Sequence, residues 1–139
     1  MVCQDVFSRG EGRLSGKGNP FPLSPTIVLK AGKPFLVTGS QGGSRIISTV
    51  LQVIMNVIDH DMNIQEAVNA VRIHHQWLPD ELNVEEGLSL DTSQLLTQMG
   101  YKIVVKPTMG SAPSILIAPT RKIYFGAADP RKNGLALGY

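Results

Sequence analysis

Two adjacent glycines, Gly42 and Gly43, lie in the segment of this sequence best suited to chemistry, Gly39-Ser40-Gln41-Gly42-Gly43-Ser44. The segment follows a β-rich run and precedes an apolar run with helical spacing, so it is expected at the N-terminus of a helix. Backbone N–H groups there lack a partner within the helix and lie at the positive end of its dipole. Glycine also permits close approach because it carries no side chain. The segment can therefore hold a phosphate or the oxyanion of an acyl-transfer intermediate.

Other interpretations of this glycine segment compete with anion binding. It matches neither G-x-x-x-x-G-K-[ST] nor G-x-G-x-x-G, so nucleotide binding is a poor fit. Its spacing alone favours an ordinary tight turn between a strand and a helix. A non-catalytic module that binds an anion through the turn is a further alternative.

The other chemically versatile residues form no catalytic set. His74 and His75 are adjacent, so their side chains point in different directions, and the single cysteine, Cys3, lies far from them in the sequence. We expect structural histidines and neither a metal site nor a cofactor. Asp129 and Arg131 are expected to form a structural ion pair in a turn. No nucleophile, base and orienting group are brought together by the sequence.

The elements that must position the glycine turn follow from hydrophobic periodicity. Two β-rich runs, residues 26–30 and 34–38, are joined by Ala31-Gly32-Lys33, which is typical of a hairpin. Both runs are too apolar to alternate, which predicts a sheet covered on both faces. Apolar residues at three- and four-residue steps predict a helix over residues 46–58, with Ser44 as its N-cap.

Later elements complete an α+β pattern. Asn63 and Glu66 have the spacing of a capping box and predict a second helix. A third helix is expected to begin at Ser89 or Asp91 and to end at Gly100. A short, alternating strand is expected before that helix and three strands after it, over residues 82–85, 101–106, 114–118 and 122–125. This order predicts a mainly antiparallel sheet with helices on its face.

Composition limits the class of protein and its partners. The chain has 139 residues, of which 42% are hydrophobic and 17% charged, as expected for one folded domain. A net charge of +2 without a basic cluster argues against nucleic acid or an anionic membrane as a partner. One cysteine excludes an internal disulfide, and no apolar run is long enough to span a membrane. The Gly/Pro-rich residues 1–23 are expected to be unstructured.

Four segments carry a resemblance to a known family: SPTIV, VTGSQGGSRI, RIHHQWLPD and GAADPR, at residues 24–28, 37–46, 72–80 and 126–131. Together with the ending Gly-Tyr, they resemble the C-terminal part of the small subunit of γ-glutamyltranspeptidase. The resemblance implies part of an N-terminal-nucleophile hydrolase αββα sandwich. It also implies cleavage of the γ-glutamyl bond of glutathione, with transfer of the γ-glutamyl group to water, amino acids or peptides. In that family, Gly42 and Gly43 would form the oxyanion hole.

The resemblance runs from Ser24 to Tyr139 and does not include the family's nucleophilic threonine or its large subunit. We therefore expect a truncated chain that is inactive alone and requires the large subunit and the N-terminal part of the small subunit as partners. Phe21 and Pro22 stand where the family has a Ser-Ser pair, so no substrate-binding residue is assigned. Residues 1–23 are expected to be a non-family segment, created by a frameshift near the codon for Leu23, because a shifted frame can encode Pro-Leu-Ser-Ser there.

Two further expectations concern location and an alternative role. The first 15 residues lack a basic start and an apolar segment, so no signal peptide is predicted. Expressed alone, the chain would stay in the cytoplasm, whereas the family is typically periplasmic or secreted in bacteria. The alternative to an enzyme fragment is a non-catalytic anion- or protein-binding module on the same scaffold.

Overall fold

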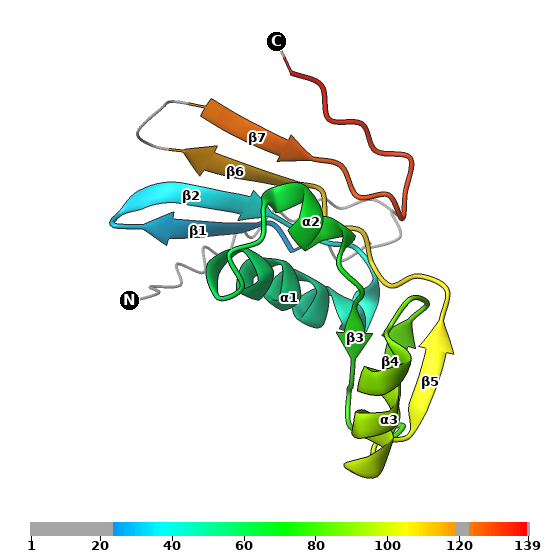
Figure 1. Ribbon diagram of the computed structural model, residues 1–139. Helices are drawn as coiled ribbons and strands as arrows, with labels where there is room; N and C mark the ends of the chain where they lie inside the picture. Colours follow the sequence, from blue (N-terminus) through cyan, green and yellow to red (C-terminus); the bar gives the residue numbers. More distant parts are fainter. Residues whose placement is uncertain (1–23, 119–122, 139) are drawn as a thin grey trace, which may run out of the picture.

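The computed structural model describes residues 24–118 and 123–138. The expectations for residues 1–23 and for Tyr139 lie outside these described residues. The described chain forms two sheets with helices packed beside them (Figure 1).

The larger sheet has four antiparallel strands in the order β1-β2-β6-β7, namely β1 (Thr26–Lys30), β2 (Lys33–Thr38), β6 (Ser114–Ala118) and β7 (Ile123–Ala127). The hairpin predicted between β1 and β2 is confirmed. Its loop residues Ala31 and Gly32 both have positive φ, at 52° and 75°, as a type I′ turn requires. The turn sets the pairing of Lys30 with Lys33, and a register shift between Val28 and Leu29 then brings Val28 opposite Leu36.

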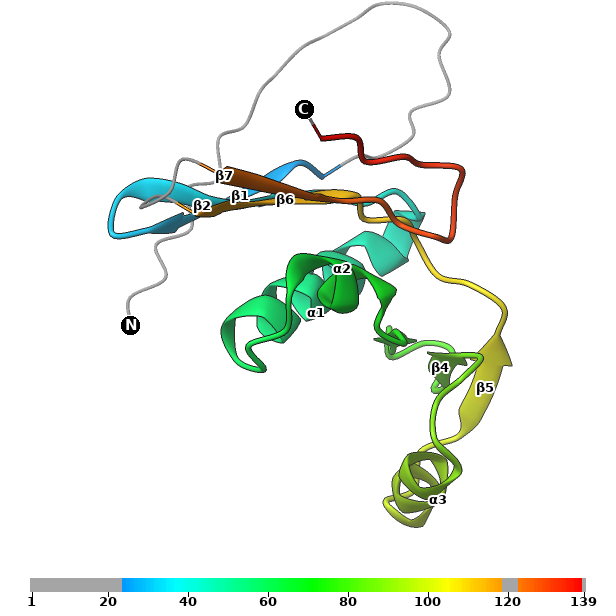
Figure 2. The ribbon, with the colours of Figure 1, turned by 45° about the horizontal axis from the view of Figure 1, so that its top comes forward.

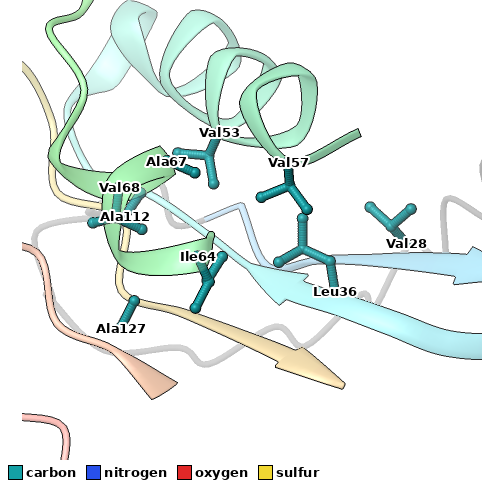
Figure 3. Packing of buried hydrophobic residues seen from close by; sticks show 9 residues of the cluster. All are labelled: Val28, Leu36, Val53, Val57, Ile64, Ala67, Val68, Ala112 and Ala127. Carbon is teal, nitrogen blue, oxygen red and sulfur yellow. The ribbon is translucent and has the colours of Figure 1, made fainter. Parts of the chain in front are cut away.

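Helices α1 (Ile46–Ile58) and α2 (Ile64–Asn69) cover one face of this sheet (Figure 2). Nine buried residues form the core between them and the strands (Figure 3): Val28, Leu36, Val53, Val57, Ile64, Ala67, Val68, Ala112 and Ala127. The predicted capping box of α2 is confirmed, because the Asn63 side chain accepts from the Glu66 N–H and Glu66 accepts from the Asn63 N–H. The core thus holds α1 and α2 against the same face of the sheet.

The expectation that the sheet is covered on both faces is wrong for the described residues. Ile27, Val37 and Ile115 align across β1, β2 and β6 on the face opposite the helices. Ile27 is 57% exposed and Ile115 is 44% exposed. The strands are apolar on both sides, but within the described part of the chain only one side is packed.

The smaller sheet contains β3 (Ile73–His74), β4 (Leu82–Glu85) and β5 (Ile103–Lys106), with β3 and β4 antiparallel and β4 and β5 parallel. Helix α3 (Leu90–Gln98) connects β4 to β5. The α3 boundaries are as predicted: Ser89 is the N-cap, and Gly100 follows the C-cap with a φ of 95°. The expected alternation in β4 is wrong, because all four of its residues are buried.

No helix in the described residues has the length and apolar character that crossing a membrane requires.

Candidate functional site

The glycine turn lies between β2 and α1, where the change in hydrophobic period predicted it. Gly42 has a φ of 131° and Gly43 a φ of 62°, both outside the range that other L-residues readily adopt. A single 3-10 turn, η1 (Gly43–Arg45), follows at once and leads into α1. It is closed by a hydrogen bond of 3.3 Å from the Arg45 N–H to the Gly42 carbonyl. The chain therefore enters the helix through backbone geometry that needs glycine.

Ser44 is not the N-cap of α1, contrary to the sequence prediction. Arg45 occupies that position, and no side chain caps the helix. The Ser44 hydroxyl instead donates to the side-chain oxygen of Gln76, at 2.8 Å. The 3-10 turn moves the start of the helix beyond Ser44 and leaves its hydroxyl free for this distant partner.

A second loop, which contains Gly110 and Ser111, packs against the glycine turn. Gln41 forms an isolated antiparallel bridge with Ser111, and the Ser111 N–H donates to the Ser40 hydroxyl oxygen at 3.3 Å. A Cβ on Gly42 would lie 3.4 Å from the Cα of Gly110, so the two backbones are in direct contact. Gly110 has a φ of 68° and no room for a side chain. A Cβ there would lie within 3 Å of the hydroxyl oxygens of Thr49 and Ser40.

Four buried charged residues hold this second loop in place. Arg72 pairs with Asp129 at 2.6 Å, and Arg131 pairs with Glu85. Their side chains are between 1% and 8% exposed, so water screens these pairs poorly. The Met109 N–H donates to Glu85 at 2.5 Å, and the Met109 carbonyl accepts from Arg72 at 2.8 Å. Both backbone groups of Met109, next to Gly110, are thereby tied to charged side chains.

Both carboxylates of this network are held in the charged form. Burial on its own would raise the pKa of Asp129, but N–H donors from Ala112 and Arg131 and the charge of Arg72 outweigh it, so the pKa is lowered. Burial likewise opposes ionisation of Glu85, while hydrogen bonds from Arg131 and from the Met109 N–H lower its pKa overall. The pKa values of both carboxylates therefore lie below the ordinary carboxyl range.

The predicted structural ion pair between Asp129 and Arg131 is present and belongs to a larger network. The two side chains do meet, at 3.4 Å, but the stronger contacts of each are with Arg72 and Glu85. These partners lie 57 and 46 residues away in the chain, and no local pattern indicated them. Arg72 and Glu85 hold the loop that packs against the glycine turn, and sequence reasoning missed both of them.

The two histidines point to different sides, as predicted. His74 is buried and contacts the Ser48 hydroxyl at 2.7 Å through Nδ1. His75 contacts the exposed Asp80 at 3.1 Å and packs edge-on against Tyr101. Within residues 24–118 and 123–138, no three acidic, cysteine or histidine side chains cluster as metal ligands would.

The comparisons with known proteins agree with this architecture. The model of the gamma-glutamyltranspeptidase family matches residues 15–139. The glutathione hydrolase proenzyme of Escherichia coli K12 is 57% identical over 118 residues, which are 84% of this chain and 20% of the relative. That of Bacillus subtilis 168 is 38% identical over 96% of this chain and 23% of the relative. The chain thus spans about a fifth to a quarter of the length of these relatives.

Solved structures extend the likeness to the fold. The T380A mutant of Helicobacter pylori gamma-glutamyltranspeptidase superposes with a TM-score of 0.77 at 53% identity, covering 91% of this chain and 70% of that one. The Pseudomonas nitroreducens enzyme complexed with L-DON gives the same TM-score at 33% identity, covering 96% of this chain and 70% of that one. These matches confirm the predicted fold class, an α+β part of an N-terminal-nucleophile hydrolase with a mainly antiparallel sheet and helices on its face. The chain belongs to the gamma-glutamyltranspeptidase family.

Proposed function

We propose that this chain supplies the oxyanion-binding turn of a glutathione hydrolase, with the backbone N–H groups of Gly42 and Gly43 as the donors. The observation that carries the proposal is the pair of positive-φ glycines directly ahead of the first helical turn, in a member of this family. The N–H groups at the start of a helix have no partner within that helix. Free donors at a helix N-terminus favour negative charge.

The chemistry assigned to the turn is that of acyl transfer. A nucleophilic hydroxyl oxygen attacks the γ-carbonyl carbon of a γ-glutamyl amide, and the carbonyl π electrons move onto its oxygen. The two N–H groups stabilise this oxyanion until it collapses, the C–N bond breaks and the amine leaves with the proton that the hydroxyl has lost. Water, an amino acid or a peptide then attacks the carbonyl carbon of the γ-glutamyl ester and forms a second oxyanion. This oxyanion collapses, the ester C–O bond breaks, and the nucleophilic hydroxyl is restored with the proton lost by the attacking water or amine. In our proposal the nucleophile is a threonine in a part of the protein that the matched segment does not include.

The remaining part of such a protein also has a place to bind on this chain. The row formed by Ile27, Val37 and Ile115 makes the uncovered sheet face apolar, and an apolar face of this kind favours burial against another layer. We propose that the large subunit and the N-terminal part of the small subunit cover it, and that the complex, unlike the chain alone, turns over γ-glutamyl compounds.

A chimeric enzyme tests the oxyanion assignment. Residues 24–139 replace the matching segment of the E. coli glutathione hydrolase proenzyme, and hydrolysis of a γ-glutamyl anilide is measured per mature enzyme. Gly42→Ala forces a side chain onto a φ of 131° and should lower kcat by about 100-fold or more with little change in KM, because the oxyanion exists only in the transition state.

A matched control separates this effect from a general cost of replacing glycine. Gly100 has a φ of 95°, and a Cβ there would meet no atom within 4 Å. Gly100→Ala should leave kcat unchanged. The assignment is wrong if Gly42→Ala retains kcat within a factor of two. Turnover of glutathione by the purified 139-residue chain alone would contradict the external nucleophile, and tight binding of a γ-glutamyl compound without turnover in the chimera would favour the binding module.

A further inference from the structure

Helix α1 carries a polar stripe on the side that faces β3. Ser48 and Gln52 lie four residues apart on α1, and Ser44 precedes them by another four. Gln52 contacts the edge of β3 as a strand would: its amide nitrogen donates to the Ile73 carbonyl at 2.8 Å, and its oxygen accepts from the Ile73 N–H at 2.9 Å. A helix side chain thereby replaces a neighbouring strand and fixes β3 against α1.

Two side chains from β3 and the residues after it complete the contact with this stripe. His74 meets the Ser48 hydroxyl at 2.7 Å. The side-chain oxygen of Gln76 lies 2.8 Å from the Ser44 hydroxyl and 3.1 Å from Nε2 of His74, while its amide nitrogen donates to the Leu78 carbonyl at 3.0 Å. These three contacts are compatible with one orientation of the Gln76 amide.

The donors and acceptors in this chain of contacts can be assigned from chemistry. An amide oxygen only accepts, so both the Ser44 hydroxyl and Nε2 of His74 must donate to Gln76. On the other side of the ring, Nδ1 of His74 lies 2.7 Å from the Ser48 hydroxyl, which also donates to the Arg45 carbonyl at 3.1 Å. Gln76 is the point at which the firmly packed His74 is connected to the exposed Ser44.

We propose that Gln76 is a positioning residue for the glycine turn, which it holds through Ser44, the residue that follows Gly43. The inference rests on the oxyanion function proposed above. From one side the turn is supported by the loop at Gly110; from the other, the hydrogen bond to Gln76 is the side-chain contact that Ser44 makes in the described structure. Glycine has the widest range of backbone conformations. Two consecutive glycines therefore hold their N–H groups in one orientation only when the residues on both sides of the pair are fixed.

The test uses the same chimeric enzyme and a double-mutant cycle. Gln76→Met keeps the length of the side chain and removes both polar atoms, and Ser44→Ala removes the donor. Each should lower kcat by about 3- to 10-fold, the effect of losing one ordinary hydrogen bond, with KM unchanged. The double variant should be no slower than the slower single variant, because both remove the same interaction.

Two further measurements distinguish positioning from a general structural role. Ser44→Thr retains the hydroxyl and should restore most of the wild-type kcat. The affinity for a γ-boronate analogue of glutamate, which forms a tetrahedral anionic adduct with a hydroxyl nucleophile, should fall in parallel with kcat, while the affinity for glutamate itself should not. The matched control is Gln98→Met, an exposed glutamine on α3, which should change none of these values.

The possible outcomes separate this inference from the function on which it rests. If Gly42→Ala lowers kcat and the Gln76 and Ser44 variants do not, the positioning role is wrong and the oxyanion turn stands. If neither Gly42→Ala nor the Gln76 variant changes kcat, both are wrong. Additive losses in the double variant would also overturn the positioning role, since the two side chains would then act independently.

Discussion

The most demanding prediction concerns Gly110, whose backbone contacts the glycine turn at Gly42. In Gly110→Ala, the new Cβ would lie 2.8 Å from the Thr49 hydroxyl oxygen and 2.9 Å from the Ser40 hydroxyl oxygen. Both of these side chains are buried, so neither can turn away into solvent. The substitution therefore combines a steric clash with an unfavourable backbone conformation, because φ at this position is 68°.

The two contributions can be estimated separately. Placing an L-residue in the left-handed region costs about 1–2 kcal/mol. Overpacking a buried site by one methyl group costs about 1–3 kcal/mol. The free energy of unfolding should therefore fall by about 2–5 kcal/mol. Gly32→Ala is the matched control: its φ is 75° and its Cβ would meet no atom within 4 Å, so it should cost only the backbone part.

Urea unfolding of the 139-residue chain, followed by far-ultraviolet circular dichroism, measures both losses. Titrations at several protein concentrations separate self-association from folding stability. The informative quantity is the difference between the two alanine variants, because the backbone contribution largely cancels. Equal destabilisation of the two variants would refute the steric argument and the close packing of the loop against Ser40 and Thr49.

Three other variants or conditions probe the remaining parts of the structure. Because the pKa values of Glu85 and Asp129 are lowered on folding, their stabilisation is present above the ordinary carboxyl range and is lost as pH falls through it; the urea midpoint should drop between about pH 5 and pH 3, and a flat profile would contradict the ionised network. Arg72→Met leaves Asp129 buried without this partner and should cost about 3–5 kcal/mol in urea unfolding, whereas a loss below 1 kcal/mol would argue against the pairing. Asn63→Ala removes one half of the α2 capping box and should cost about 1 kcal/mol, with faster amide hydrogen exchange in the first turn of α2; unchanged exchange at Glu66 would count against the cap.

Features that depend on neighbouring residues were predictable from the sequence. The position of Gly42 followed from the change between strand and helix periodicity on its two sides. The pairing of Asn63 with Glu66 and the role of Gly100 at the end of α3 followed from spacings of a few residues. In each case the residues that cause the feature lie only a few positions apart in the sequence.

Features that depend on residues far apart in the chain were not predictable from the sequence. Ser44 has the residue type and position of an N-cap, yet its partner Gln76 is 32 residues away. Gly110 gave no local sign that it would meet Gly42. One available signal was not used: Ser44, Ser48 and Gln52 place polar groups at four-residue steps before and along a mainly apolar helix, a pattern that indicates a polar partner on that side.

The four buried charges also impose an order of assembly during protein synthesis. The loop behind the glycine turn is fixed by Asp129, which accepts from the Ala112 N–H, and by Arg131, which pairs with Glu85. The ribosome must therefore synthesise the chain through Arg131 before the turn at Gly42 and Gly43 is fully supported. The nascent chain would thus not hold the glycine turn in its final geometry before the residues that follow β7 are made.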